Sequence, residues 1–197
     1  MSTIHLTQRW RHQGGTHALP DPDLVHPELV APETPAARAG RYAAGVVRIS
    51  LGWIFLWAFL DKLFGLGFAT ERDASWLNGG SPTDGFLSFA TQGPFADAFQ
   101  SLAGHTAVDV LFMAGLLGVG LTLVTGIGVR IGAISAAVMV VLMWAAALWP
   151  ENNPFMDDHL VYAGVLVMLA LTDAGRTLGL GRMWERVPLV RRHPWLR

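Results

Sequence analysis

The chain has 197 residues, of which 52% are hydrophobic and 15% are charged, whereas typical soluble domains carry about 25% charged residues. The net charge of -1 argues against nucleic-acid binding, which requires a basic surface. No residue is a cysteine, which excludes disulfides, thiolate metal sites and dithiol redox chemistry. A redox function would therefore need a bound cofactor or a non-thiol centre.

Residues 1–41 are predicted to form a proline-rich cytoplasmic arm. Acidic residues alternate with prolines along its second half. Such a segment cannot bury enough apolar surface to offset the entropy of ordering it. We therefore expect an extended, partly disordered arm. Its prolines are Pro20, Pro22, Pro27, Pro32 and Pro35.

Four apolar segments follow, at residues 42–64, 106–125, 131–149 and 156–174. Each is close to the roughly 20 residues that a helix needs to cross about 30 Å of hydrocarbon. None contains a proline, and backbone groups in lipid must pair within their own segment, which favours helices. The sequence predicts an all-α membrane protein whose residues 42–176 form a four-transmembrane-helix up-down bundle. A soluble bundle is the alternative, and the uncharged third segment argues against it.

The loops predict the orientation of these four spans. The loop before the second span has one basic residue, Arg72, among several acidic ones, and the loop before the last span has none. Basic residues gather instead around Arg41, around Arg130 and in residues 177–197. Because positively charged loops stay inside, we expect a multi-pass protein of the cell membrane with both termini cytoplasmic and 177–197 as a basic cytoplasmic tail.

The two loops that join the first three spans differ greatly in length. The first is long and contains two short amphipathic stretches, around Phe86 and Phe99. These are predicted to be short interfacial helices on the outer membrane surface or caps on the bundle. The second, Gly126–Arg130, is so short that the spans around it must form an antiparallel hairpin. Small residues at four-residue spacing favour close packing of that hairpin. They are Ala114, Gly118, Gly128, Gly132 and Ala136.

Two ionisable residues lie inside spans near their cytoplasmic ends, Arg48 in the first and Asp173 in the fourth. Charges at such depth are costly and mark function or a structural ion pair. The first and fourth helices are neighbours in a closed four-helix bundle, so we expect an ion pair between Arg48 and Asp173. The alternative is that Arg48 reaches the inner interface while Asp173 pairs locally with Arg176.

A second polar group lies at the outer ends of the spans. In an up-down bundle its members would converge at the outer mouth. Helix capping and solvation are the alternative, since Asn153 or Asp157 suits the N-cap of the last helix and acidic residues suit its N-terminus. Imidazole and carboxylate ligands suit several metals, but this spacing specifies none, and no metal is predicted. The group comprises Asp61, His105, Asp109, Asp157 and Asp158.

Four short motifs stand out in the spans and the loops between them. The first helix carries RISLG at Arg48–Gly52 and FLDKL at Phe59–Leu63. The loop before the second span carries WLNGGSP at Trp76–Pro82, and the last helix is entered through NNPFMDDH at Asn152–His159. In their sequences and order, these motifs resemble those of the DoxX-like family of integral membrane proteins, especially its actinobacterial-type subgroup. The resemblance covers residues 41–192 and implies a four-helix membrane bundle.

The resemblance also implies a function. The related DoxD-type proteins are subunits of thiosulfate:quinone oxidoreductase, which implies quinone-linked redox chemistry with a soluble redox partner or a homo-oligomer. The lack of cysteine removes the simplest way to hold a thiosulfate sulfur covalently. Two alternatives stay open: a non-catalytic membrane anchor or scaffold for a soluble partner, and a small-solute or proton pathway along the face between Arg48 and Lys62.

A quinone needs an apolar slot with a few polar groups at its carbonyls. Aromatic side chains of the first span could supply the slot, and polar groups at the outer ends of the first and last spans could supply the donors. We therefore expect Lys62 and His159 to line one outer-side cavity. The predicted quinone-binding residues are Phe55, Trp57, Phe59, Lys62, His159 and Tyr162.

Overall fold

The computed structural model describes residues 33–197, and within them every regular element is a helix. The predicted all-α class is therefore confirmed. Most of the predicted proline-rich arm lies outside the described residues, but its last part was assigned wrongly, because helix α1 already begins at Pro35. Proline suits the first turn of a helix, and the alanines that follow Pro35 are the strongest helix formers.

Three helices are long and apolar enough to cross a membrane, and they indicate a membrane protein. They are α1 (Pro35–Phe64), α4 (Thr106–Thr125) and α5 (Val129–Ala146). The fourth predicted span is a shorter apolar helix of 14 residues, α6 (Asp158–Leu171). It begins where the Asp157 side chain caps it and ends at Thr172, whose backbone is extended.

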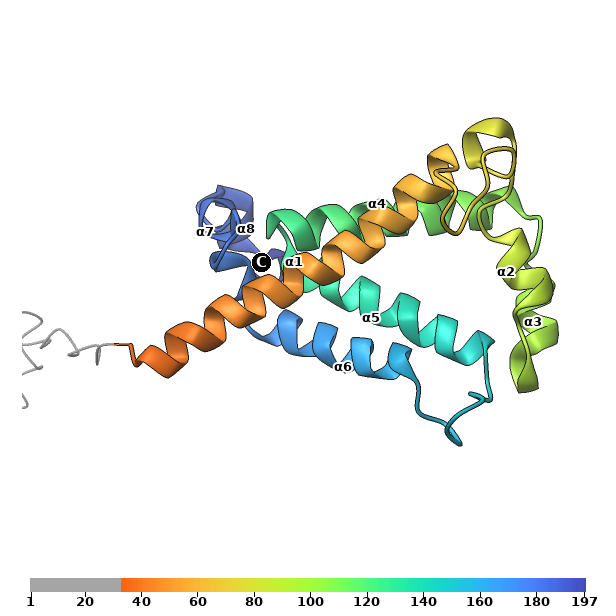
Figure 1. The fold of residues 1–197 in the computed structure, drawn as a ribbon. Coiled ribbons are helices and arrows are strands. Elements are labelled where there is room, and N and C mark those ends of the chain that lie inside the picture. Colours follow the sequence, from red (N-terminus) through yellow and green to blue (C-terminus); the bar gives the residue numbers. More distant parts are fainter. Residues whose placement is uncertain (1–32) are drawn as a thin grey trace, which may run out of the picture. The chain divides into compact units, whose positions relative to one another are not determined.

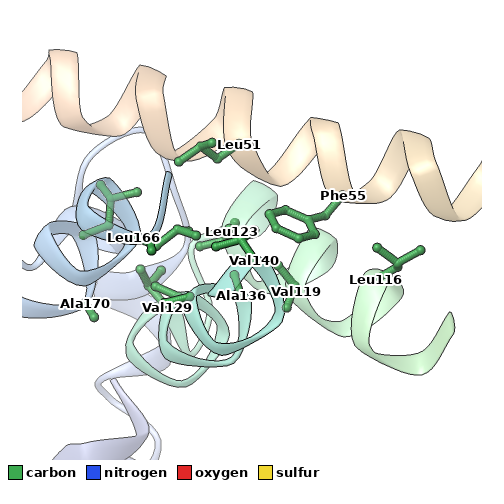
Figure 2. Close-up of a cluster of buried hydrophobic side chains, with 14 of the residues drawn as sticks. Leu51, Phe55, Leu116, Val119, Leu123, Val129, Ala136, Val140, Leu166 and Ala170 are labelled. Carbon is green, nitrogen blue, oxygen red and sulfur yellow. The ribbon is translucent and has the colours of Figure 1, made fainter. Parts of the chain in front are cut away.

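Helix α1 lies along α4, α4 and α5 form the predicted hairpin, and α5 packs against α6 (Figure 1). Helix α1 contacts α6 only sparsely. The core between these helices is purely apolar and takes side chains from all four (Figure 2). Leu51 and Phe55 of α1 meet α4 there, and Leu166 of α6 contributes from the opposite side.

Glycines set the closest helix contacts. A Cβ added to Gly120 of α4 would lie 2.9 Å from the Cα of Leu56 in α1, and one on Gly132 of α5 would lie 1.9 Å from the Oγ1 of Thr122 in α4. Gly118, predicted to pack in the hairpin, faces open space. The small-residue prediction therefore holds at Gly132 and is wrong at Gly118.

Short helices occupy the outer loop and the tail. In the outer loop, the predicted amphipathic stretches form helices, and Phe89 there is 87% exposed. The tail folds back on the bundle, where the backbone N–H of Arg130 donates to the Arg197 carbonyl at 2.8 Å. The outer-loop elements are η2 (Trp76–Asn78), α2 (Asp84–Phe89), η3 (Gly93–Phe95) and α3 (Ala96–Gln100). The tail elements are η4 (Ala174–Arg176), α7 (Gly181–Trp184), α8 (Pro188–Arg192) and η5 (Pro194–Leu196).

Candidate functional site

Arg48 is fully buried, and its guanidinium links α1 to the ends of two other segments. It donates hydrogen bonds to the carbonyls of Leu123 and Val124 in the last turn of α4. It also donates to the carbonyls of Thr177 at 3.3 Å and Leu178 at 2.8 Å, just after η4. The last carbonyls of a helix have no partner within the helix and carry its negative dipole end. Arg48 therefore caps α4 and fastens the start of the tail to α1.

The expected ion pair between Arg48 and Asp173 is not formed, so that prediction is wrong. The Asp173 carboxylate instead pairs with Arg176 at 3.0 Å, which is the local alternative. Arg176 also donates to Glu185 at 2.8 Å. This hydrogen bond is the main reason why the pKa of the Glu185 carboxyl falls and the pKa of the Arg176 guanidinium rises relative to their ordinary values. The pairing holds α7 against η4.

Asp61 and Asp109, the two buried members of the outer polar group, each organise the outer loop. The Asp61 carboxylate accepts backbone N–H bonds from Phe68 at 3.3 Å and Ala69 at 3.0 Å. The Asp109 carboxylate accepts from the Thr83 hydroxyl at 2.6 Å and from the Ser81 hydroxyl at 2.8 Å. A buried carboxylate needs such donors to offset its desolvation. Both residues therefore act as anchors for loop backbone.

The other members of this group lie at helix ends. Asp157 caps α6 by accepting from the backbone N–H of His159 and of Leu160, which confirms the capping alternative at this position. Its second oxygen lies 2.8 Å from Nδ1 of His159. Asp158 and His105 are exposed, in the first turn of α6 and at the N-cap of α4. Within residues 33–197 no side-chain hydrogen bond or ion pair joins any two of the five, and no metal-ligand cluster forms.

The residues predicted to bind quinone are divided among different surroundings. Phe55 is 7% exposed and fills the core (Figure 2), and Phe59 packs beside it. His159 and Tyr162 belong to α6, whose start lies apart from the end of α1 in Figure 1. The expected common cavity for Lys62 and His159 therefore has no support from the helix arrangement.

Trp57 instead belongs to a group of three aromatic side chains, of which only Trp57 was predicted as a site residue. Its ring meets the edge of Phe68 with centroids 5.1 Å apart, and Trp53 lies 5.9 Å away on the preceding turn. Trp53 is 51% exposed and Phe68 74% exposed. We call Trp53, Trp57 and Phe68 the aromatic surface. The hydrogen bond to Asp61 holds the backbone of Phe68 beyond the end of α1, so no periodicity within α1 could indicate this position.

An arginine-lined cavity of about 1070 Å³ lies where the start of α1 meets η4, α7 and α8. Two carboxylates, Asp173 and Glu185, also line it. Apart from Arg176, which was the alternative partner of Asp173, the sequence analysis used these arginines only to orient the chain, and it predicted a basic tail. The spacing of the arginines in residues 176–197 was the sequence signal that could have indicated this cavity. The lining arginines are Arg41, Arg176, Arg182, Arg186, Arg191 and Arg197.

The fold thus defines an all-helical protein with three helices that can span a membrane. Comparisons of the chain with protein-family models, with curated proteins and with solved structures give no match. The resemblance to DoxX-like proteins therefore rests on the motifs in the sequence.

Proposed function

We propose that the chain is a DoxX-like multi-pass protein of the cell membrane, with four spans and both termini in the cytoplasm. Three long apolar helices support the membrane placement, and α6 is antiparallel to α5 and equally apolar in character. The six arginines of the cavity lie at one end of these helices. That distribution favours a cytoplasmic position for this end.

Reporter fusions test this topology. Fusions after Arg130 and after Arg192 are expected to report cytoplasm, while fusions near Gly80 and Asn153 are expected to report the outside. The measurement is the activity ratio of a cytoplasm-active and a periplasm-active reporter at each position. An outside signal after Arg192 would reject the fourth span, since three spans would put the tail on the opposite side from Arg130.

Within this topology we propose that the protein is a membrane subunit of a quinone-dependent redox system. The aromatic surface carries this proposal. Trp53 and Phe68 are exposed and both contact the ring of Trp57, so a flat quinone ring could reach this surface directly from the lipid. Lys62 follows one residue after Asp61 at the same helix end, and its ammonium makes no hydrogen bond within residues 33–197, which leaves it able to donate to a quinone carbonyl.

Quinone retention tests the proposed site. Protein purified in mild detergent is expected to keep quinone, measured by mass spectrometry of an organic extract. Trp57→Ala should lower the quinone-to-protein ratio about two- to tenfold, because an aromatic pair contributes about 0.5–1.5 kcal/mol. Lys62→Ala should lower it as well. Trp149→Ala is the control, since Trp149 is a 61% exposed indole that forms no aromatic pair within residues 33–197.

The quinone proposal differs from the first sequence expectation at His159. Because His159 is held by Asp157 at the α6 cap, His159→Ala should leave quinone content unchanged. No quinone in the wild-type extract, or equal loss in Trp57→Ala and Trp149→Ala, would count against the aromatic surface as a quinone site.

A membrane anchor or scaffold for a soluble partner is the second candidate. The exposed phenyl ring of Phe89 and the 64% exposed Leu77 favour it, because both lie on the outer loop rather than on a long helix. The same mild-detergent preparation distinguishes the two functions. A stoichiometric protein partner without quinone supports the scaffold, and quinone without a partner supports the redox subunit.

A further inference from the structure

The arginine-lined cavity has more positive charge than its own carboxylates can balance. Six arginines line it, together with the side-chain carboxylates of Asp173 and Glu185. Both carboxylates are already engaged by a single arginine, Arg176, at 3.0 Å from Asp173 and 2.8 Å from Glu185. Within residues 33–197, neither carboxylate therefore forms an ion pair within 4.0 Å with Arg182, Arg186 or Arg191.

Three of those arginines, Arg182, Arg186 and Arg191, come from the tail. Within residues 33–197, none of the three guanidinium groups donates a hydrogen bond or forms an ion pair within 4.0 Å. The part of the tail that carries these arginines is nevertheless folded. Val190 of α8 is fully buried, and Trp184 of α7 donates its indole N–H to the Leu196 carbonyl at 2.7 Å. The guanidinium groups are thus presented by a folded structure.

Like charges gathered along one cavity wall attract anions to it. Guanidinium groups match phosphate oxygens with paired N–H donors. The volume of about 1070 Å³ exceeds what a bare phosphate ion needs and has room for a phosphate ester with its attached glycerol. We propose that this cavity binds the phosphate group of an anionic phospholipid headgroup in the inner leaflet.

The surroundings of the cavity favour a lipid as the source of that phosphate. Met183 of α7, Leu189 of α8 and Trp195 of η5 are 66%, 57% and 60% exposed. They lie beside the arginines along the same short helices. Apolar side chains next to basic ones, on helices at the end of a span, are typical of segments that lie in the headgroup region. A soluble phosphate ester would need no such apolar rim.

The proposal rests on the cytoplasmic membrane placement of this face, which the reporter fusions test independently. It does not depend on quinone binding. Its consequence is that the lipid would join α1, through Arg41, to the tail, through α7 and α8.

Native mass spectrometry of the full chain in mild detergent tests this inference. Phosphatidylglycerol is titrated against phosphatidylcholine, and the fraction of protein that carries each lipid is measured. The wild type is expected to prefer phosphatidylglycerol. Arg182→Gln/Arg191→Gln should weaken phosphatidylglycerol binding by about tenfold or more, since each basic residue near an anionic lipid contributes roughly fivefold in affinity.

A double variant of equal charge is the control. Arg72→Gln/Arg192→Gln removes one arginine from the outer loop and one that neighbours Arg191 but does not line the cavity. It should weaken phosphatidylglycerol binding clearly less than the cavity variant does, because neither side chain lines the cavity. If a double variant lowers the melting temperature, Arg191→Gln is compared with Arg192→Gln alone, two exposed neighbours on α8.

Competition separates the two possible sources of phosphate. Inorganic phosphate and glycerol 3-phosphate, added at millimolar concentration, should not displace the lipid. If either compound displaces the lipid and the cavity variant still loses lipid binding, the cavity is a phosphate site, but its ligand is soluble. Equal binding of both lipids by the wild type, or equal losses in the cavity and control variants, would overturn the proposal.

Discussion

Arg48→Met is expected to lower the free energy of unfolding by about 3 kcal/mol, the largest effect of any single substitution considered. The guanidinium donates to four carbonyls, two at the end of α4 and two after η4. Hydrogen bonds that involve a charged group contribute about 1.5–3 kcal/mol each. The total loss is smaller than their sum, because removing a buried charge also removes its desolvation cost.

Thermal unfolding in detergent measures this effect, and about 3 kcal/mol corresponds to a fall in Tm of roughly 10 °C for a chain of this size. Arg48→Lys should recover only part of the loss, since an ammonium cannot reach carbonyls on two segments with a planar fork of donors. Arg72→Met, at an exposed arginine of the outer loop, is the control and should leave Tm unchanged. A wild-type Tm for Arg48→Met would show that the buried guanidinium does not fasten the two segments.

Gly120→Ala is expected to cost about 1–3 kcal/mol, which is typical when an extra methyl group is forced into a packed interface. The new Cβ would lie 2.9 Å from three atoms of Leu56, including its backbone N and Cα. Backbone atoms cannot move aside as a side-chain end can, so α1 and α4 would have to separate. Their contact is one of the two most extensive between helices.

Gly118→Ala on the same helix is the matched control, because a Cβ there meets nothing within 4 Å. Both substitutions raise helix propensity equally, so the difference between their Tm values isolates the steric term. Gly118→Ala should be neutral or stabilising by up to about 1 kcal/mol. Equal Tm values for the two variants would mean that α1 and α4 are not in close contact at Gly120.

The long helices were predictable because length, hydropathy and absent prolines determine them locally. The second span matches α4 at both ends, Thr106 and Thr125. The predicted helix boundaries were wrong where a single polar side chain determines the end of a helix. Helix α6 begins only after Asp157 caps it, so its first apolar residue, Met156, lies outside the helix. Four spans and their orientation stay predictions.

The candidate sites were harder to predict because partners far apart in sequence create them. Arg48 and Asp173 were predicted to pair because they lie at a similar depth along their helices. In the structure, the Arg48 guanidinium instead donates to carbonyls at the end of α4. Backbone acceptors have no sequence signature. The arginine-lined cavity also escaped prediction, since it requires the tail to fold back beside Arg41.

The unequal helix lengths have a consequence for the surrounding bilayer. Helix α1 has 30 residues and α6 has 14, which correspond to about 45 Å and about 21 Å at 1.5 Å per residue. In the proposed topology both meet the same hydrocarbon layer, about 30 Å thick. Lipids beside α6 must compress or tilt, while α1 extends beyond the layer. The protein would thus thin the membrane on one flank only, and hydrophobic mismatch would draw short-chain lipids or a second apolar surface to that flank.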